Sequence, residues 1–391
     1  MRVGLLGHLL SYTPGYRRAG VSRYIEALVE HLPVAGPELD LVVFTNRSVY
    51  RSAPEGLRRR CTWQVSRFPT EYPLVRVLWE QLAAPAVTRS QRIDLVHGPV
   101  NVVPLIGRGC RVVTVHDLAF LRYPSHYPLL KRRYLATMTR RSVRRADYVI
   151  AVSQQTRDDL INLCGAHPET VVVVPNGVDS TVRRITDAPA LESFRARHRL
   201  PESFLLFLGT LQPRKNVEGL LKAYARVKDE VSIPLVIAGA RGWGDSPIFR
   251  LVRELGLVEY VQFVGYVSPR DLPLWYSAAT IFVYPSLYEG FGLPVLEAMA
   301  CGTPVITSSV SSLPEVAGNA AVLVDPHDID ALAGAIRELC GSPEARAALS
   351  RAGQQRATTF TWMRTAEKTL AVYRQAVDLA ESSRFAFERK R

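Results

Sequence analysis

Short runs of β-branched and aliphatic residues alternate with amphipathic segments along most of the chain. In the first half, strands are expected at 3–6, 41–44 and 93–96, and helices at 22–32 and 74–87. Two parallel strands need a long crossover connection, which is usually a helix. The alternation therefore predicts an α/β fold built from parallel βαβ units.

A second set of such units follows a polar stretch after Asn176, which lacks strand alternation and is interpreted as an interdomain connection. A chain of 391 residues is long enough for two domains. We expect a Rossmann-like N-terminal domain over 1–180, a Rossmann-like C-terminal domain over 200–365, and a C-terminal helix with a basic tail over 366–391. The last helix is expected to cross back to the N-terminal domain. Because parallel sheets bind ligands beyond the carboxyl ends of their strands, a cleft between the domains is the expected site.

The formal net charge of +13 favours partners that carry phosphate, such as a nucleotide sugar, a nucleic acid or an anionic lipid headgroup. Nucleic acid is the weakest of these interpretations, because the sequence has no recognised nucleic-acid-binding motif. Five isolated cysteines without metal-ligand spacing favour a reducing compartment. Neither a signal peptide nor a membrane-spanning run is apparent, so a cytoplasmic protein is expected.

Two carboxylates, Glu289 and Glu297, lie on either side of a glycine-containing turn between an expected strand at 281–283 and an expected helix at 294–300. We expect Glu297 in the first turn of that helix. Glycine permits close backbone approach, and a helix N-terminus offers free N–H groups with positive partial charge. The pattern predicts a site for a phosphate with a hydroxyl-rich sugar beside it.

Two other interpretations of this segment are weaker. The glycines at 290 and 292 partly match a dinucleotide-binding fingerprint, but the third position is Val295 and no acidic residue ends the next expected strand. A plain strand-to-helix turn would also tolerate glutamates, since acids are favoured near a helix start.

Arg214 and Lys215 directly follow the expected strand at 204–208, at the entrance to a helix. A guanidinium and an ammonium together can neutralise a diphosphate, and they can stabilise a departing phosphate without a metal ion. The alternative is a solvated basic helix start, which the helix dipole disfavours. A third candidate, His116, ends the expected strand before Asp117, where a histidine is either a structural residue or a ligand-binding one.

Taken in order, these motifs make the chain resemble the family 4 retaining glycosyltransferases of the GT-B superfamily. The resemblance implies that Arg214 and Lys215 bind the donor diphosphate, that Glu297 binds the ribose and that Glu289 binds the transferred sugar. It also implies that His116 lies over the reacting sugar, where it would hydrogen-bond a hydroxyl or polarise the reacting centre. It implies too that the backbone amides of Phe291, Gly292 and Leu293 complete the donor pocket. The remaining matching pieces are the loop from Pro14 to Gly20, TVHD, AVS, PNGVD, VGYVS, ACGTPVI, SSLPEV and FTW.

In this family the loop after the first strand carries a Gly-Gly pair, and here the pair is Ala19-Gly20, which leaves Gly20 as the expected phosphate-binding residue. The implied reaction transfers a hexose from a GDP- or UDP-linked donor to a hydroxyl of a growing glycan or lipid-linked acceptor. Mannose from GDP-mannose is the first choice, because the GVSRY and HDLAFLRYP segments resemble mannosyltransferases. A phosphorylase or a disaccharide synthase of the same fold is the alternative.

Two further features bear on cofactors and partners. Asp328-Ile-Asp330 matches a metal-binding D-x-D pattern but precedes an amphipathic helix, so N-capping explains it better and no metal is expected. The expected helix at 129–145 is rich in arginine and lysine. It is either a solvated surface helix or a docking element for anionic lipid, which would place the protein at the inner face of the membrane.

Overall fold

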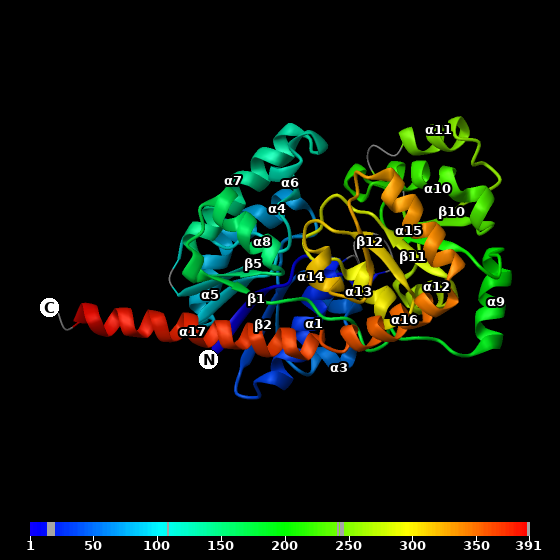
Figure 1. The fold of residues 1–391 in the computed structure, drawn as a ribbon. Coiled ribbons are helices and arrows are strands. Elements are labelled where there is room, and N and C mark those ends of the chain that lie inside the picture. The colour runs from blue at the N-terminus through cyan, green and yellow to red at the C-terminus, as the bar shows by residue number, and fades with distance from the viewer. Residues whose placement is uncertain (14–19, 108, 241, 243–245, 389–391) are drawn as a thin grey trace. The chain divides into compact units, whose positions relative to one another are not determined.

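The computed structural model describes residues 1–13, 20–107, 109–240, 242 and 246–388 (Figure 1). The chain forms two α/β units. The N-terminal unit consists of Met1–Gly177 together with Trp362–Arg391, and the C-terminal unit is Val178–Thr361. The return of the last helix to the N-terminal unit agrees with the expectation from the sequence.

The N-terminal unit has a parallel sheet in which the described strands follow the order β3-β2-β1-β4-β5-β6-β7. Its central strands are aliphatic runs with almost no exposed surface, as expected for a sheet covered by helices on both faces. The strands are β1 (Arg2–Leu6), β2 (Asp40–Thr45), β3 (Thr62–Val65), β4 (Leu95–Gly98), β5 (Cys110–Val115), β6 (Tyr148–Ala151) and β7 (Val171–Val173).

Helices connect these strands and cover the sheet. They are α1 (Gly20–Ala35), α2 (Arg47–Ser52), α3 (Glu55–Arg58), α4 (Pro73–Leu78), η2 (Trp79–Ala83), α5 (Ala84–Ser90), α6 (Ala119–Arg122), η3 (Pro124–His126), α7 (Leu129–Arg145), α8 (Gln154–Asp159), η4 (Leu160–Cys164), η5 (Pro168–Thr170) and α17 (Trp362–Glu388). The expected helix at 74–87 is divided into α4, a π-helical segment η2 and α5. Pro85, in the first turn of α5, has no N–H to donate to the preceding turn, which accounts for the irregular hydrogen bonding there.

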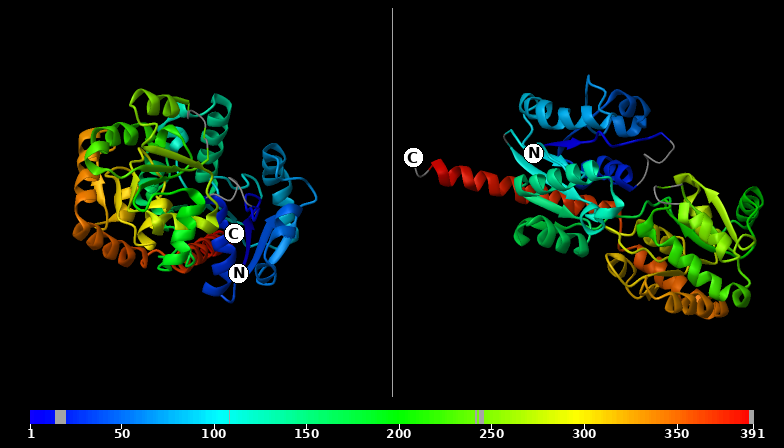
Figure 2. Two further views of the ribbon diagram at one scale, coloured as in Figure 1. Left: turned by 90° about the vertical axis from the view of Figure 1, so that its right-hand side faces the viewer. Right: turned by 90° about the horizontal axis from the view of Figure 1, so that it is seen from above.

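Helix α17 packs against α1 and β5 of the N-terminal unit, along which it lies and beyond which it extends (Figure 2). Tyr373 of this helix is fully buried, and its hydroxyl lies 2.6 Å from His97 Nδ1, while His97 Nε2 lies 2.8 Å from Thr114 Oγ1. The Thr114 hydroxyl is also 2.9 Å from the Tyr24 hydroxyl. This buried polar chain ties the C-terminal helix to β4, β5 and α1.

The C-terminal unit has a second parallel sheet, in which the described strands follow the order β10-β9-β8-β11-β12-β13. The strands are β8 (Leu205–Leu208), β9 (Leu235–Ala238), β10 (Val261–Gly265), β11 (Ile281–Tyr284), β12 (Val305–Ser308) and β13 (Val322–Val324). The helices are α9 (Ala188–His198), η6 (Pro213–Lys215), α10 (Val217–Val231), α11 (Ser246–Glu254), η7 (Pro269–Asp271), α12 (Leu272–Ala278), α13 (Leu293–Ala300), α14 (Leu313–Ala317), α15 (Ile329–Gly341) and α16 (Pro343–Ala357).

The polar stretch after Asn176 differs from its interpretation as a plain connection. It contains α9, whose buried Phe194 packs edge-on against Trp275 of α12, with ring centroids 5.0 Å apart. A single aromatic anchor thus fixes a helix that is otherwise mostly polar, and the stretch belongs to the C-terminal unit. In the described part of the chain, no helix combines the length and the apolar character needed to cross a bilayer.

Candidate functional site

The turn after β8 positions Arg214 and Lys215. The short helix η6 carries both residues, and Asn216 then takes a left-handed conformation with φ of 56° before α10 begins. The main-chain carbonyl of Arg214 accepts a hydrogen bond from the Leu287 amide at 2.8 Å, and Ser286 Oγ lies 2.9 Å from the same oxygen. The cation pair is therefore fixed to the segment that follows β11.

The segment after β11 carries Glu289 and leads into α13. Gly292 has φ of 111°, and a Cβ at this position would lie 2.8 Å from a methyl group of Leu313, so a glycine is needed here. The Ser311 and Ser312 hydroxyls donate to the Glu289 carbonyl at 2.7 and 2.9 Å. These bonds, together with the one from the Glu289 amide to Ser311 Oγ at 3.1 Å, hold the main chain at Glu289 in place.

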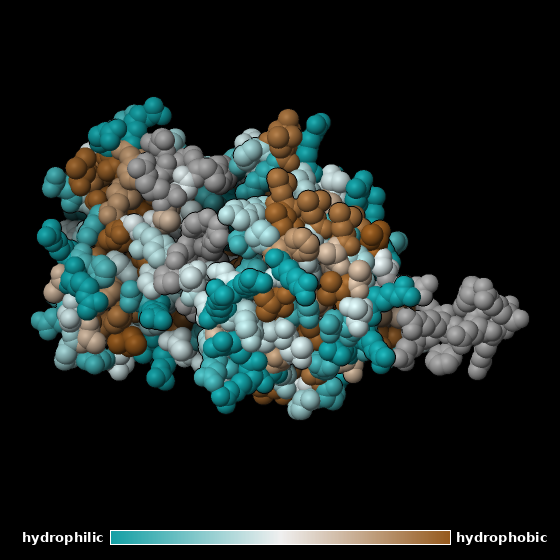
Figure 3. Space-filling model, turned by 180° about the vertical axis from the view of Figure 1, so that it is seen from behind, coloured by the Kyte–Doolittle hydropathy of each residue, from teal (hydrophilic) through white to brown (hydrophobic). Residues whose placement is uncertain are grey.

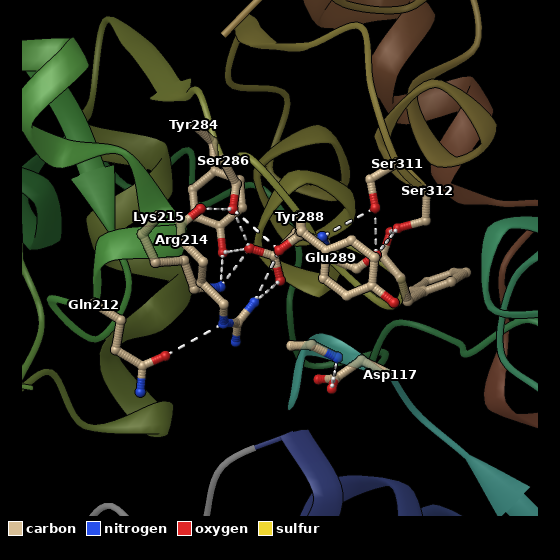
Figure 4. A network of polar contacts seen from close by, with 12 residues as sticks. Asp117, Gln212, Arg214, Lys215, Tyr284, Ser286, Tyr288, Glu289, Ser311 and Ser312 are labelled. Atoms are coloured by element: carbon tan, nitrogen blue, oxygen red, sulfur yellow. Dashed lines mark hydrogen bonds and ion pairs between the residues drawn. The ribbon is translucent and has the colours of Figure 1, made fainter. Parts of the chain in front are cut away.

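The Glu289 carboxylate is buried and accepts hydrogen bonds from four side chains (Figure 4). One oxygen accepts from Lys215 Nζ at 2.5 Å, from Ser286 Oγ at 2.6 Å and from the Tyr284 hydroxyl at 2.9 Å. The other oxygen accepts from Arg214 Nη1 at 2.9 Å. The structure thus brings together Arg214, Lys215 and Glu289, which lie far apart in the sequence.

Two opposing effects set the charge of Glu289. Burial alone would raise its pKa, but the positive charges of Lys215 and Arg214 and the hydrogen bonds to the carboxylate outweigh burial and lower the pKa to about 2. Burial and the nearby Glu289 charge raise the pKa of Tyr284, so this hydroxyl remains a donor. At neutral pH the cluster contains a carboxylate between two cations.

The sequence predicted Glu297 in the first turn of α13. That prediction is wrong. Glu297 is the fifth residue of the helix, because α13 begins at Leu293, one residue before the expected start at Pro294. Its side chain is buried and accepts a hydrogen bond from the Tyr276 hydroxyl of α12 at 3.0 Å. Phe291 is also buried and packs against Phe360, with ring centroids 5.8 Å apart.

His116 and Gly20 belong to the N-terminal unit. His116 follows β5, and its ring Nε2 lies 2.8 Å from the Pro99 carbonyl. A carbonyl can only accept, so Nε2 carries the proton and Nδ1 is unprotonated in the neutral ring. The Asp117 carboxylate accepts from the Ala119 amide at 3.1 Å, at the start of α6. Gly20 is the first residue of α1, whereas residues 14–19, which include Ala19, lie outside the described residues.

The two aspartates of the D-x-D pattern have separate contacts. The Asp328 side chain accepts from the Ala331 amide at 2.9 Å and caps α15, as expected from the sequence. Asp330 forms an exposed ion pair with Arg226.

Comparisons with known proteins show the family of the chain. A family model described as Glycosyltransferase Family 4 matches residues 18–182, and one described as Glycosyl transferases group 1 matches residues 191–356. The O-antigen chain mannosyltransferase B of Escherichia coli is 32% identical over 371 residues, which cover 92% of this chain and 97% of that protein.

The chain belongs to the family 4 glycosyltransferases.

Another mannosyltransferase is similar to this glycosyltransferase in sequence, and solved structures of other proteins share its fold. The MMP alpha-(1->4)-mannosyltransferase of Mycolicibacterium hassiacum is 33% identical over 255 residues, which cover 64% of this chain and 59% of that protein. Sucrose-phosphate synthase from Thermosynechococcus elongatus aligns with a TM-score of 0.75 and 27% identity, over 96% of this chain and 98% of that one. Anabaena HepE in complex with UDP and glucose aligns with a TM-score of 0.72 and 21% identity, over 95% and 98% of the two chains.

Sequence reasoning missed the residues that support the carboxylates of this glycosyltransferase. Tyr284 is the last residue of β11, Ser286 lies two residues beyond it, and Tyr276 lies in α12. A signal was present for the first two, because polar side chains at the carboxyl end of a buried parallel strand point toward the ligand-binding edge of the sheet. Ser311 and Ser312 belong to the SSLPEV segment, whose contact with Glu289 depends on the tertiary fold.

We predict that the His116 ring of the glycosyltransferase stays neutral throughout the pH range in which the enzyme would be assayed. Burial lowers the pKa of His116 from the usual 6.5 or so, and this effect outweighs the opposing influence of the Pro99 carbonyl and Asp117. Because the charged form is disfavoured, the ring gains a proton only at lower pH. Nitrogen NMR, with the signal assigned through His116→Gln, should show an unprotonated Nδ1 from about pH 8 to about pH 6.5. A titration midpoint at or above about pH 6.5 would contradict the prediction.

Proposed function

We propose that this glycosyltransferase transfers mannose from GDP-mannose to a hydroxyl of a glycan or lipid-linked acceptor, with retention of the anomeric configuration. The mannosyltransferases among its relatives support the choice of sugar. Retention follows from the family. The GDP donor is the expectation made from the sequence, with UDP as the alternative base.

The observation that carries the proposal is the cluster of the half-buried Arg214 with the buried Lys215 and Glu289. In the proposed reaction, the bond between the sugar C1 and the diphosphate oxygen breaks, and a bond from the acceptor oxygen to C1 forms. The acceptor proton passes to the departing phosphate. Arg214 and Lys215 would neutralise the charge that develops on that phosphate, and fixed charges in a buried site need little reorganisation to do so.

Glu289 would have two roles in this site. Without donor, it balances the charge of both cations and holds them in position. With donor, the diphosphate would share the cations and the carboxylate would accept hydrogen bonds from sugar hydroxyls. Glu297 is proposed to bind the ribose, and the amides of Phe291, Gly292 and Leu293 to face the donor at the start of α13. His116 and Gly20 of the N-terminal unit are proposed to contact the sugar and the phosphate.

We also propose that catalysis needs no metal ion, because the cation pair supplies the charge that a metal would otherwise provide. The expected rate of transfer is therefore the same with and without a chelator such as EDTA. The acceptor is proposed to lie at the cytoplasmic face of a membrane, with which the basic helix α7 would make peripheral contact.

A thermal-shift screen tests the nucleotide part of this proposal. GDP at about one hundred times its dissociation constant should stabilise the protein by about 2.7 kcal/mol, whereas UDP and ADP at the same concentration should have a smaller effect. Proton NMR of the product from GDP-mannose and a mannose acceptor should then show an α-linked sugar. A larger response to UDP would contradict the choice of base, and replacement of the nucleotide by free phosphate would favour a phosphorylase.

A further inference from the structure

A row of leucines lies exposed on the helices that follow β3. Leu74 is 80% exposed, Leu78 is 59% exposed and Leu82 is 66% exposed. The spacing of four residues places them on one side of α4 and η2, while Trp79 points into the core of the N-terminal unit. Phe68 and Tyr72, in the segment just before α4, are more than half exposed as well. An apolar row of this extent is unusual on a helix that has no partner.

The start of α7 adds two more exposed leucines. Leu129 and Leu130 are the first residues of the helix, and Leu130 is 81% exposed. Gln81 of η2 donates to the Val103 carbonyl at 3.1 Å and the Val103 amide donates to Ser142 Oγ of α7 at 3.1 Å, so η2 and α7 contact the same segment. Seen from behind, hydrophobic side chains gather on this face of the N-terminal unit (Figure 3). We define the leucine surface as Phe68, Tyr72, Leu74, Leu78, Leu82, Leu129 and Leu130.

Basic residues accompany the leucine surface. Helix α7 contains seven arginine and lysine residues and no acidic residue, and its first turn carries Lys131 and Arg132. Arg67 is exposed next to Phe68. The segment from 67 to 82 has two acids: Glu71 is exposed beside Tyr72, whereas Glu80 is buried 3.7 Å from Arg76, and burial raises its pKa to about 7 despite that arginine. The surface therefore combines exposed leucines with a positive border.

We propose that the leucine surface inserts into the headgroup region of an anionic lipid bilayer, with α7 providing electrostatic attraction. Apolar side chains bordered by lysine and arginine fit this occupant, because the apolar groups leave water while the cations meet lipid phosphates. A protein partner would need matching acidic groups around an apolar socket, and a second copy of this chain would bring like charges together. The inference deepens the proposed function and rests on it for the lipid-linked acceptor, whereas membrane binding itself can be measured independently.

The test is flotation of the full-length protein with vesicles of phosphatidylcholine alone or with about a third phosphatidylglycerol. The wild-type protein should bind the anionic vesicles and leave the neutral ones largely unbound. The triple variant Leu74→Ser, Leu78→Ser, Leu82→Ser should bind anionic vesicles at least about tenfold more weakly, because each leucine loses apolar contact with the lipid. The single variant Leu130→Ser should show a smaller loss in the same direction.

A matched control is Val258→Ser, which removes an apolar side chain of similar exposure from the C-terminal unit and should bind vesicles like the wild type. Transfer from GDP-mannose to a water-soluble mannose acceptor should be unchanged in the triple variant, and its melting temperature shows whether it is folded. If neither the wild type nor any variant carries out this transfer, but vesicle binding is weakened by the leucine substitutions, the proposed function is wrong and the membrane-binding role of the leucine surface is supported. The inference would be overturned if a folded triple variant bound anionic vesicles as well as the wild type does. It would also be overturned if the wild type were a dimer and the triple substitution converted it to a monomer without weakening vesicle binding.

Discussion

Replacement of Arg214 by Gln together with Lys215 by Met is expected to lower kcat/KM by more than about 10³-fold and to weaken nucleotide binding. Both substitutions keep much of the side-chain volume but remove the charges that contact Glu289 at 2.9 and 2.5 Å. Loss of a single preorganised donor in an active site typically costs about 10²- to 10³-fold, and here two cations disappear. Steady-state kinetics and calorimetric titration with GDP measure the two effects.

The double variant also leaves a buried carboxylate without opposite charge, which should lower the free energy of unfolding by about 3–5 kcal/mol. Arg214→Lys separates chemistry from stability, because it keeps the charge but loses the guanidinium that contacts both Tyr288 and Glu289. We expect it to fold normally and to lose activity to a lesser degree. The control Arg226→Gln removes an exposed cation of the same unit, which pairs with Asp330, and should leave kinetics unchanged. A folded double variant with normal nucleotide affinity and turnover would disprove the proposed role of the pair.

The local sequence pattern predicted the strands correctly where their side chains are completely buried. Strands such as β5 (CRVVTV) and β11 (IFVY) are completely buried and rich in β-branched and aromatic residues, as is typical of a parallel sheet whose two faces are covered by helices. Edge strand β3 was missed, because its side chains are half-buried and its sequence, TWQV, has no long apolar run. Helix α9 was missed for a similar reason: Phe194 alone contributes a buried side chain, so the segment shows no apolar stripe.

The candidate site was predictable in its residue types but not in its pairings. Arg214, Lys215 and Glu289 could each be singled out from their places after strands, yet their sequence separation of about 75 residues hides the ion pairs. The neighbouring strands β8 and β11 bring them together. The position of Glu297 within α13 was misjudged by one residue, because the left-handed Gly292 lets the helix begin at Leu293.

Glu289→Gln is expected to reduce turnover by about 10²- to 10³-fold and to remove a pH-dependent part of the stability. The folded state lowers the pKa of Glu289 from 4.5 to about 2. A lowered pKa means that the ionised carboxylate stabilises the folded protein above the unfolded pKa, and that this contribution is lost as the pH falls toward the folded pKa. The contribution is about 3 kcal/mol at neutral pH. It should decline between about pH 5 and about pH 2.

The measurement is the free energy of unfolding of wild type and Glu289→Gln at several pH values. Their difference should be largest near neutral pH and should shrink below about pH 5, because the protonated wild-type carboxyl then resembles the neutral amide. Glu254→Gln is the matched control, since this exposed glutamate lies 3.7 Å from Arg250 in the same unit and such pairs contribute no more than about 1 kcal/mol. A difference between wild type and Glu289→Gln that stays constant down to about pH 3 would show that the carboxylate is not held by the two cations, and the proposed arrangement of the site would then be wrong.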